Sequence, residues 1–294
     1  MAKSNHPIKP YLKWAGGKRR LWPEIKKYLP KDIHNYTYYE PFIGAGAIFF
    51  ALQPKKAVIN DFNTQLILTY TVIKEQVEEL IELLKEYKTR NNEAYYYEVR
   101  SFDRDAAQFN KLTDAEKAAR LIFLNKTCFN GLYRVNSQGL FNVPYGRYKN
   151  PAICEETVLR QISTYLNAND ITILNDDFEC AAVYANADSF IYFDPPYHSQ
   201  DNSNFTGYQA DGFGEKEQER LRNLMIKMTN LGIKCLLSNS DTEYIRELYN
   251  DDGFDIISVQ AARSINCNAA GRGNVNEVLI KNWETNEKEH GNNH

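Results

Sequence analysis

Asp194, Pro195, Pro196 and Tyr197 form the sharpest chemical signal in the sequence and come directly after the apolar run "SFIYF". Proline has no N–H, so the carbonyls of such a turn stay free to accept hydrogen bonds. We predict that an amino group on a flat ring donates one hydrogen to the Asp194 carboxylate and another to the Pro195 carbonyl, while Tyr197 stacks on the ring. Such an amine is a poor nucleophile, so positioning and electrostatics must carry its reaction. A proline turn that merely ends a strand is the alternative interpretation.

A second group of residues favours a nucleotide-like ligand. Gly44 and Gly46, in "EPFIGAGAIFF", carry no Cβ and therefore let a ligand approach the backbone closely. Asp61 ends the next strand, and in nucleotide-binding α/β folds such an acid holds ribose hydroxyls. Phe62 beside it is predicted to cover one face of an adenine ring. Taken alone, this glycine turn is equally typical of a purely structural turn.

Two further motifs are predicted to converge on the same cleft. In "KWAGGK", residues 13–18, Lys18 stands at the start of a predicted helix and is suited to meet a carboxylate. In "NDDF", Asp177 follows a strand and is predicted to read an adenine amino group, with Phe178 on the plane of the ring. A single acid–aromatic pair is usually structural, but several strand ends with this chemistry favour one ligand cleft.

The elements that must position these residues alternate between strands and helices. Strands are predicted at 36–42, 56–61, 171–174, 189–193, 233–238, 254–259 and 275–282. Helices are predicted at 18–30, 63–88, 113–125, 156–167, 178–186, 215–231 and 241–249, and a glycine turn enters a further helix at 43–52. This alternation indicates an α/β fold with a Rossmann-like, mostly parallel sheet and helices on both faces.

The α/β rhythm is interrupted between residues 63 and 153, which predicts an inserted domain. Here "NGLYRVNSQGLFNVPYGRY" alternates aromatic, apolar and polar residues around "NSQG" and predicts a β-hairpin near 131–146. The stretch from Lys117 to Cys154 contains no acid, and its bases are Lys117, Arg120, Lys126, Arg134, Arg147 and Lys149. A surface of one sign suits a polyanion, although unevenly distributed solvated charge explains it equally well. The remaining chain forms the main domain at 1–62 and 154–284, followed by a polar tail at 285–294.

The composition limits the classes of protein to which this sequence can belong. A chain of 294 residues with 43% hydrophobic and 25% charged residues is ordinary for a globular protein, and its net charge of −3 does not by itself indicate nucleic acid. The five cysteines form no CxxC pair, which argues against a disulfide framework or a zinc site and fits a reducing compartment. No apolar stretch approaches the ~18 residues of a membrane span, and the N-terminus lacks a secretory apolar region. We therefore expect a cytoplasmic protein with no membrane contact.

The ordered set of motifs resembles the DNA adenine-N6 methyltransferases of the Dam type, which form the α group or D12 class. The motifs "LKWAGGK", "EPFIGAG", "IND", "NGLYRVNSQGLFNVPYGRY" and "FDPPY" extend in family order over residues 10–283, and "FNVPYGRYKNP" is especially similar to DpnM-like GATC methylases. The resemblance implies the methyltransferase fold, with residues 63–153 as a target-recognition domain. It also implies S-adenosyl-L-methionine as methyl donor, S-adenosyl-L-homocysteine as product, no metal, and adenine in double-stranded DNA as acceptor. A base inside a duplex cannot reach the donor, so the adenine must be flipped out.

The resemblance also assigns roles to residues of this sequence. The cofactor is expected to contact Trp14, Ala15, Gly16, Lys18, Phe42, Gly44, Gly46, Asp61, Phe62, Asp177, Phe178 and Asp194. The flipped adenine is expected to lie against the catalytic residues Asp194, Pro195, Pro196 and Tyr197. The bases of an expected GATC site are expected to be contacted by Lys13, Leu132, Arg134, Pro144 and Tyr148. Phe129 and Asn130 are expected to lie at the space left by the flipped base. Phosphate or positioning contacts are expected from Lys126, Asn136, Asn142 and Arg147.

Three other functions compete with this one. Methyltransferases of RNA or of protein amide nitrogens also use such a proline turn, but theirs usually begins with Asn or lacks the long basic hairpin. A DNA-binding module with an inactive cofactor site predicts a broken glycine turn or a lost Asp194, and both are intact. A dehydrogenase explains Asp61 and the glycines but gives "DPPY" and "KWAGGK" no role. We expect a monomer, bacterial and nucleoid-associated or phage-encoded, that acts either alone or with a cognate restriction endonuclease.

Overall fold

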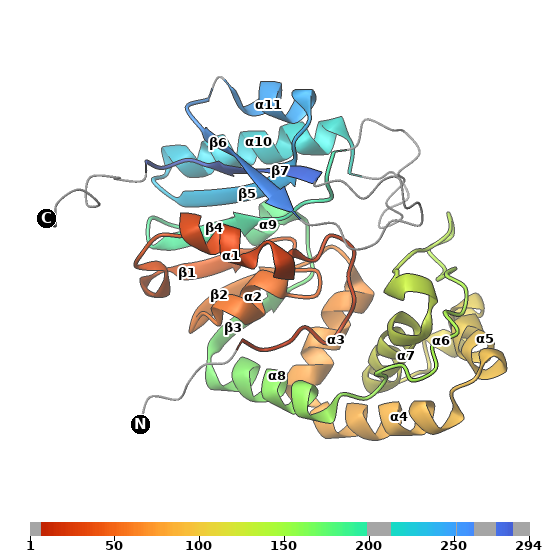
Figure 1. The fold of residues 1–294 in the computed structure, drawn as a ribbon. Coiled ribbons are helices and arrows are strands. Elements are labelled where there is room, and N and C mark those ends of the chain that lie inside the picture. The colour runs from red at the N-terminus through yellow and green to blue at the C-terminus, as the bar shows by residue number, and fades with distance from the viewer. Residues whose placement is uncertain (1–6, 199–212, 251, 262–274, 285–294) are drawn as a thin grey trace, which may run out of the picture.

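The computed structural model describes residues 7–198, 213–250, 252–261 and 275–284 and shows one seven-stranded sheet in the order β3-β2-β1-β4-β5-β7-β6 (Figure 1). Strands β1 to β5 pair in parallel, and β7 runs antiparallel to both β5 and β6. The expected α/β architecture with a mostly parallel sheet is therefore confirmed. The strands are β1 Thr37–Glu40, β2 Lys56–Asn60, β3 Asp170–Leu174, β4 Ser189–Phe193, β5 Lys234–Ser240, β6 Asp255–Ala261 and β7 Val275–Lys281. Every predicted strand is present, and its ends differ from the prediction by at most two residues.

Helices cover both faces of the sheet because its central strands are apolar on both sides. All five residues of β4 are buried, and Tyr192 enters one hydrophobic core while its neighbour Phe193 enters the other. The first core is packed by helices α2 Ala47–Leu52, α3 Thr64–Glu75 and α8 Glu156–Ala168. The second is packed by helices α9 Phe178–Ala181, α10 Glu215–Asn230 and α11 Glu243–Asn250.

The order of the strands creates a crevice at the carboxyl ends of β1 and β4. From β1 the chain proceeds to β2 and β3 on one side, whereas β4 and β5 lie on the other side. The loops that leave the two neighbouring strands, 41–46 and 194–198, therefore diverge from the same edge of the sheet. In open α/β sheets, ligands bind at such a topological switch point.

Helices α4 to α7, called here the helical lobe, lie beside the sheet (Figure 1). They are α4 Val77–Arg90, α5 Glu93–Ser101, α6 Ala106–Phe109 and α7 Asp114–Thr127, with the short 3₁₀ turn η4 Phe102–Arg104 between α5 and α6. Thr113 caps α7 in a capping box with Glu116. The sequence did not predict α5 or α6. The division of the chain at residues 63 and 153 stays a prediction.

Three predicted helices are shorter or broken in the structure. The 18–30 segment forms three short pieces, η1 Lys18–Arg20, α1 Trp22–Ile25 and η2 Lys26–Tyr28, because Pro23 favours a first turn and provides no N–H to a continuous helix. The 63–88 helix is divided at Gln76, whose φ of −136° is not helical. The 178–186 helix ends at Ala181. A further 3₁₀ turn, η3 Ile33–Asn35, precedes β1.

The predicted hairpin near 131–146 pairs antiparallel but forms no continuous strands. Its pairing consists of two isolated bridges, Cys128 with Tyr145 and Val135 with Phe141, and the 3₁₀ turn η5 Phe129–Gly131 lies between Cys128 and Val135. The reason lies in the helical lobe, whose side chains take the backbone groups that a ladder would use. Arg104 and Asp103 bond the carbonyl and the N–H of Phe141, and the Val143 carbonyl accepts from Tyr96 and Arg100. Residues 129–148 are called the recognition segment below.

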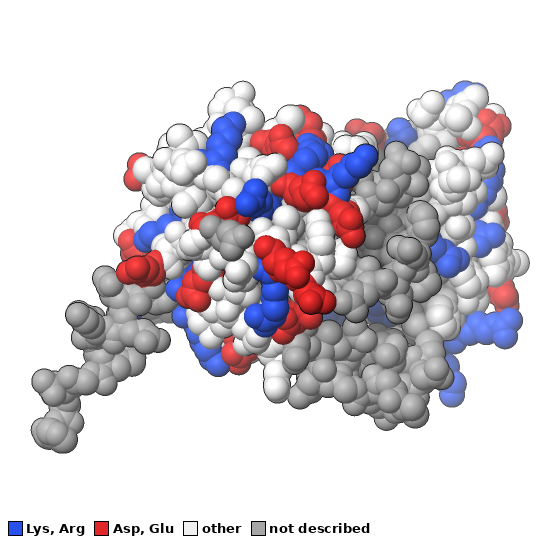
Figure 2. Space-filling view, turned by 90° about the horizontal axis from the view of Figure 1, so that it is seen from above, with Lys and Arg blue, Asp and Glu red and all other residues white. Residues whose placement is uncertain are grey.

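The predicted basic surface is smaller than the sequence suggested. Arg120 is 1% exposed and pairs with Asp103 at 2.8 Å, and Lys126 is 7% exposed and pairs with Glu155 at 2.6 Å. Arg134, Arg147 and Lys149 remain exposed. Seen from above in Figure 2, acids and bases are interspersed over α10 and α11, whereas Lys and Arg predominate along the right-hand edge, on the side of the helical lobe. Among the described residues, no helix combines the length and the apolar character that a membrane span requires.

Candidate active site

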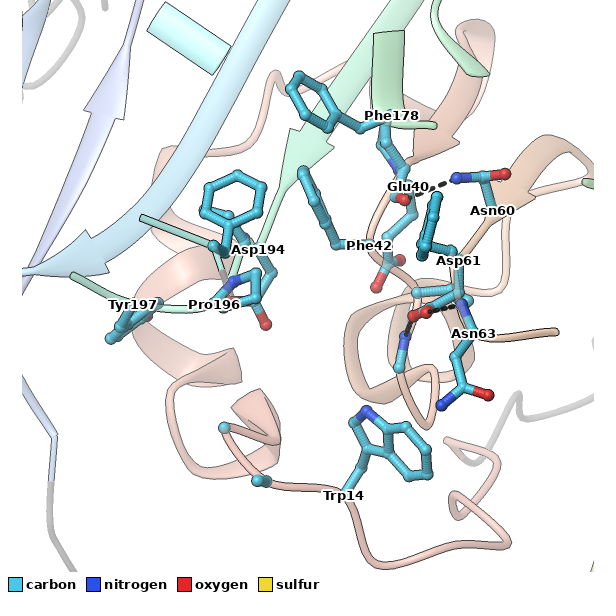
Figure 3. A pocket seen from close by; sticks show the side chains of 18 of the residues that line it. Trp14, Glu40, Phe42, Asn60, Asp61, Asn63, Phe178, Asp194, Pro196 and Tyr197 are labelled. Atoms are coloured by element: carbon cyan, nitrogen blue, oxygen red, sulfur yellow. Dashed lines mark hydrogen bonds between the residues drawn. The ribbon is translucent and has the colours of Figure 1, made fainter. Parts of the chain in front are cut away.

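A cavity of about 530 Å³ opens where the loops after β1, β2, β3 and β4 meet, which is a typical volume for a small-molecule site. Figure 3 shows Asp61 and Asn63 on one wall, Asp194, Pro196 and Tyr197 on the opposite wall, and Trp14 at one end. The cavity thus brings together the predicted cofactor and catalytic residues Trp14, Ala15, Gly16, Lys18, Phe42, Gly44, Asp61, Phe62, Asp177, Phe178, Asp194, Pro195, Pro196 and Tyr197. Gly46 lies in the same loop as Gly44 but is not part of the lining.

The glycines after β1 leave no room for a side chain. Gly44 has a φ of +51°, and a Cβ there would lie 2.9 Å from Cδ1 of Trp14. Gly46 has a φ of +72°, and a Cβ there would lie 2.8 Å from both the Phe50 ring and the Tyr70 hydroxyl. The Tyr70 hydroxyl donates to the Gly44 carbonyl at 2.9 Å, so the turn is braced from the core side. Its backbone can therefore form a wall of the cavity.

The Asp61 carboxylate is held by two backbone N–H groups. Oδ2 accepts from the Gly44 N–H at 3.0 Å, and Oδ1 accepts from the Asn63 N–H at 2.9 Å. Burial raises the pKa of Asp61 to about 6 against the lowering effect of these two hydrogen bonds. A carboxylate offers about four acceptor positions, so positions remain for the hydroxyls of a ligand.

Asn60 is a residue of this site that the sequence analysis missed. It is 1% exposed, and its Nδ2 donates to the Pro41 carbonyl at 3.0 Å and to the Asp176 carbonyl at 2.9 Å, while its Oδ1 accepts from the Asp176 N–H. One amide therefore ties together the loops after β1, β2 and β3. Its place at the end of a strand, directly before Asp61, is the only signal in the sequence that could have found it.

Asp177 and Phe178 line the cavity but are largely engaged by protein groups. Asp177 caps α9 through the Glu179 N–H and pairs with Arg220 at 2.9 Å. Phe178 is 5% exposed, with Phe42 stacked on it at 5.3 Å and the Arg220 guanidinium 4.9 Å from its ring centroid. Phe62, which is 59% exposed, offers a ligand ring more open surface than Phe178 does.

The cavity favours a cationic ligand that carries a flat ring and hydroxyl groups. Its acidic lining residues are Glu40, Asp61, Asp176, Asp177, Asp194 and Glu217, whereas Lys18 is its only lysine or arginine among the described residues. Arg220 pairs with Asp177 and Glu217, and burial raises the pKa of Glu40, so the charge of the lining comes mainly from Asp61, Asp176 and Asp194. A sulfonium nucleoside with an amino-acid chain carries a net positive charge and matches this lining. A dinucleotide pyrophosphate is a poor match, because it would face these carboxylates. The residues present therefore fit S-adenosylmethionine, and this lining argues against the dehydrogenase alternative.

The Asp194 carboxylate has one engaged and one available oxygen. Oδ1 lies 2.9 Å from Nζ of Lys18 and accepts from the Ser238 hydroxyl at 2.9 Å. Oδ2 has no hydrogen-bond partner among the residues that the structure describes. Burial raises the pKa of Asp194, and the Lys18 ammonium and the Ser238 hydroxyl lower it. Oδ2 is therefore the acceptor left for a ligand.

The proline turn is held from behind by α10 and by β7. The Pro196 carbonyl accepts from Nε2 of Gln218 at 3.0 Å, and the Tyr197 hydroxyl donates to Glu277 at 2.6 Å. No partner of the Pro195 carbonyl is found within the described ranges. The Lys18 ammonium lies 4.3 Å from the centroid of the Tyr197 ring. Gln218, Ser238 and Glu277 were missed, since only the packing of α10, β5 and β7 brings them to the turn.

His198, to which the sequence analysis gave no role, anchors the end of the same turn. Its N–H donates to Asn239 at 3.1 Å, and its carbonyl accepts from Ser240 at 2.7 Å. Its ring stacks on Tyr244 at 4.6 Å. His198 is therefore a structural residue of this turn. Ser199, named beside it in the sequence, lies outside the described residues.

The recognition segment presents alternate side chains to solvent. Leu132, Arg134 and Pro144 are exposed, whereas Tyr133, Phe141 and Val143 between them are buried. Phe129 is 46% exposed at the start of the segment, and Asn130 beside it has a φ of +56°. Nε of Arg134 donates to Asn142 at 2.7 Å, which leaves its terminal nitrogens at the surface. Three of the predicted base-contacting residues, Leu132, Arg134 and Pro144, are thus exposed on this segment.

The other residues expected to contact DNA divide into surface and structural positions. Lys13 is exposed, with its ammonium 4.4 Å from the Tyr148 ring centroid, and Arg147 is exposed near Glu93. Asn136 accepts from the N–H groups of Gln138 and Leu140 and so shapes the tip of the segment. The burial of Lys126 and its pairing with Glu155 argue against the phosphate contact expected of it. Within the described ranges, no group of three His, Cys, Asp or Glu side chains is arranged to hold a metal ion.

Comparison with known proteins finds similarity to methyltransferases and to a DNA adenine methylase. Residues 14–265 match the family described as D12 class N6 adenine-specific DNA methyltransferase. The chain is 43% identical over 284 residues to Type II methyltransferase M1.LlaDCHI of Lactococcus lactis subsp. cremoris, covering 96% of this chain and 98% of that protein. It is 41% identical to Type II methyltransferase M.MjaIII of Methanocaldococcus jannaschii, covering 94% and 99%. It is 38% identical to the DNA adenine methylase of Haemophilus influenzae, covering 92% of each chain.

Proposed function

Since the chain belongs to the D12 class of N6 adenine-specific DNA methyltransferases, we propose that it methylates the adenine of GATC after flipping that base out of the duplex. Membership of the class makes it an enzyme that acts on DNA with S-adenosylmethionine as methyl donor. The flipped base, the GATC site and the roles of individual residues are the parts that we propose. The motif order and the exposed side chains of the recognition segment support them.

The observation that carries the proposal is a pair of acceptors at the proline turn that no described residue engages. Oδ2 of Asp194 and the Pro195 carbonyl have no partner among the described residues, and both residues line the cavity. An exocyclic amine has two hydrogens, and these two acceptors match them. Accepting both hydrogens turns the nitrogen lone pair out of conjugation with the ring and increases its nucleophilicity.

The charges around Asp194 suit this role. Lys18 opposes the effect of burial and favours the ionised carboxylate, which is the form that accepts a hydrogen bond from an amine. Burial still raises the pKa of Asp194, so Oδ2 is suited to take the proton that the methylated nitrogen must lose. Tyr197, fixed by Glu277, provides a ring against which the adenine is expected to lie.

The opposite wall is proposed to hold the cofactor. Asp61 would accept the ribose hydroxyls, Phe62 would cover the adenine of the cofactor, and the Gly44 turn would lie along its chain. When bound, S-adenosylmethionine supplies a methyl group that its sulfonium has already activated. The protein therefore has to orient two ligands and exclude water between them, and the cavity lies between the two groups of residues.

We propose that the bases of the DNA site are contacted by Lys13, Leu132, Arg134, Pro144 and Tyr148. Phe129 and Asn130 are proposed to lie beside the space left by the flipped base. Arg134 is suited to bidentate contact with guanine O6 and N7 in the major groove. Two relatives are named Type II methyltransferases and another is named DNA adenine methylase. We therefore propose either a role beside a cognate restriction endonuclease or a solitary role, for a protein that is a monomer in solution.

Mapping of methylated sites tests the proposal. Unmethylated plasmid is incubated with the protein and S-adenosylmethionine, and N6-methyladenine is then located by sequencing. We expect methyladenine in GATC and not in sites that differ by one base. Methyladenine in another motif would overturn the GATC assignment alone, whereas its absence despite measurable cofactor binding would overturn the proposed function.

A pair of aspartate variants tests the proposed role of Asp194. Asp194→Ala is expected to lose turnover by a factor of about 10² or more, since it removes an acceptor at the reacting nitrogen. Asp188→Ala is the matched control, because Asp188 is an exposed residue at the opposite end of β4. Both variants should retain the circular dichroism spectrum of the native protein. Wild-type turnover in Asp194→Ala would contradict the role.

A further inference from the structure

Asn125, near the end of α7, connects the segment around Lys13 to the recognition segment. It is fully buried, and its side chain makes three hydrogen bonds. Oδ1 accepts from the Lys13 N–H at 2.9 Å, and Nδ2 donates to the Lys13 carbonyl at 2.7 Å and to the Gly131 carbonyl at 3.0 Å. One amide thus holds both backbone groups of Lys13 and joins them to the recognition segment.

Two further contacts strengthen the same joint. Gly131 has a φ of +63°, and a Cβ there would lie 2.7 Å from Cβ of Lys13. Position 131 therefore has no room for a side chain beside Lys13. Trp14 stacks on Tyr133 at 5.2 Å with an interplanar angle of 28°. The register between residues 13–14 and residues 131–133 is therefore set by hydrogen bonding, by steric fit and by ring stacking.

The segment held by Asn125 leads directly into the catalytic cavity. The Gly17 N–H bonds the Trp14 carbonyl at 3.2 Å, and Nζ of Lys18 bonds the Gly16 carbonyl at 2.5 Å, which gives residues 14–18 a compact turn. Lys18 then pairs with Asp194. A chain of direct contacts therefore runs from the exposed recognition segment, through Asn125 and Lys13, to the carboxylate of the proline turn.

We propose that Asn125 is a positioning residue that makes methyl transfer depend on correct base reading. It does so by holding Lys13, and with it the turn that presents Lys18 to Asp194, in register with the recognition segment. The inference rests on the proposed function, in which Lys13 and the recognition segment read the DNA. Asn125 touches neither the DNA bases nor the reacting atoms in this scheme and acts through Lys13.

The test compares the rate of methylation of the cognate site with the rate for sites that differ by one base. The two rates are measured on one enzyme preparation, so any unfolded fraction cancels in their ratio. Asn125→Ala and Asn125→Asp are expected to lower this preference by about tenfold or more, which is the lower range of what one base contact contributes. Asn125→Asp keeps the acceptor for the Lys13 N–H and replaces the two N–H donations by carboxylate–carbonyl repulsion.

Asn282→Asp is the matched control. The Asn282 side chain also makes three hydrogen bonds, with the Cys235 N–H, the Ile233 carbonyl and the Thr229 hydroxyl, and it does not line the cavity. It is expected to lower the melting temperature while its preference stays within about twofold of the wild type. A preference within that same range in both Asn125 variants would overturn the proposal.

A double-mutant cycle tests whether Asn125 acts through Lys13. Lys13→Met is expected to lower the preference, and adding Asn125→Ala is expected to lower it little further, because the two changes remove the same contact. Full additivity would overturn the inferred route. If the wild type proves to prefer a site other than GATC, the same ratios are measured with that site, so failure of the GATC assignment is distinguished from failure of this inference.

Discussion

Nζ of Lys18 lies 2.9 Å from Oδ1 of Asp194, and this ion pair joins the first glycine motif of the sequence to the proline turn after β4. Both side chains are mostly shielded from solvent, with 6% and 18% of their surfaces exposed. A shielded pair of this kind costs stability when one member is removed, because the other charge is left unpaired. Burial raises the pKa of this carboxylate, on which the proposed chemistry depends, and Lys18 opposes that rise.

Removing the Lys18 charge is expected to shift the pH dependence of turnover. Lys18 lowers the pKa of Asp194, which burial alone would raise further. In Lys18→Met the acid limb of kcat/KM should therefore move to higher pH, with the loss at pH 7 partly recovered at pH 9. Rates of methyl transfer between pH 5 and pH 9 measure this shift. Lys27→Met, at an exposed lysine paired with Glu24, is the control, and an unshifted acid limb in Lys18→Met would contradict the prediction.

Cofactor affinity is expected to fall as the pH falls below about 6. Burial raises the pKa of Asp61 to about 6, so below that pH the free protein carries a protonated Asp61 that must lose its proton to accept ribose hydroxyls. Each pH unit below 6 should weaken binding by up to about tenfold, and the dependence should flatten above 7. Calorimetric titration with S-adenosylmethionine at several pH values measures it. Asp61→Asn should bind weakly at every pH, and an unchanged pH dependence in that variant would exclude Asp61 as its source.

Two glycines with the same φ separate backbone strain from steric conflict. Gly46 and Gly232 both have a φ of +72°, but a Cβ at Gly46 would lie 2.8 Å from Phe50 and Tyr70, whereas a Cβ at Gly232 would meet nothing within 4 Å. Gly232→Ala should cost about 1 kcal/mol of unfolding free energy. Gly46→Ala should cost about 1–3 kcal/mol more and should also weaken cofactor binding. Urea unfolding measures the difference. Equal costs for the two variants would mean that the loop of Gly46 shifts to admit a Cβ without steric cost.

Arg134 and Arg147 are expected to contribute differently to DNA binding. Arg134→Ala should cost about 1–3 kcal/mol at one guanine of the site and little at the others. Arg147→Ala should weaken binding to all sequences alike and reduce the slope of log affinity against log salt by about 1. Binding to the cognate site and to its single-base variants, at several salt concentrations, distinguishes the two. Arg160→Ala, at an arginine on α8 paired with Glu78, should change neither quantity.

Lys126 is expected to affect stability and not DNA affinity. It is 7% exposed and pairs with Glu155 at 2.6 Å, while Lys9 pairs with the same carboxylate at 2.7 Å. Lys126→Met should therefore cost about 1–3 kcal/mol of unfolding free energy, moderated by the remaining Lys9. Its salt slope for DNA binding should equal that of the wild type, whereas a lost phosphate contact would reduce the slope by about 0.9.

The alternation of strands and helices was predictable because it follows from local patterns. The runs that form β2 and β4 end in residues that stop a strand, and the capping box at Thr113 and Glu116 marks the start of α7. Local patterns were less informative where tertiary contacts compete with them. The recognition segment has a hairpin pattern, but Asp103, Arg104 and Tyr96 take its backbone groups and leave only two bridges.

The sequence by itself determined the order of the elements and the chemistry offered at each strand end. Residue type decides whether a turn can donate, accept or admit a ligand, and the residues of "GAG", "DPPY" and the strand-terminal Asp61 carry that information locally. Only the tertiary structure decided which of those atoms remain available. It paired Lys18 with Oδ1 of Asp194, buried Lys126 against Glu155, and joined Lys13 to Gly131 through Asn125. These contacts join residues far apart in the chain, so they depend on how the packed elements meet, which no local pattern records.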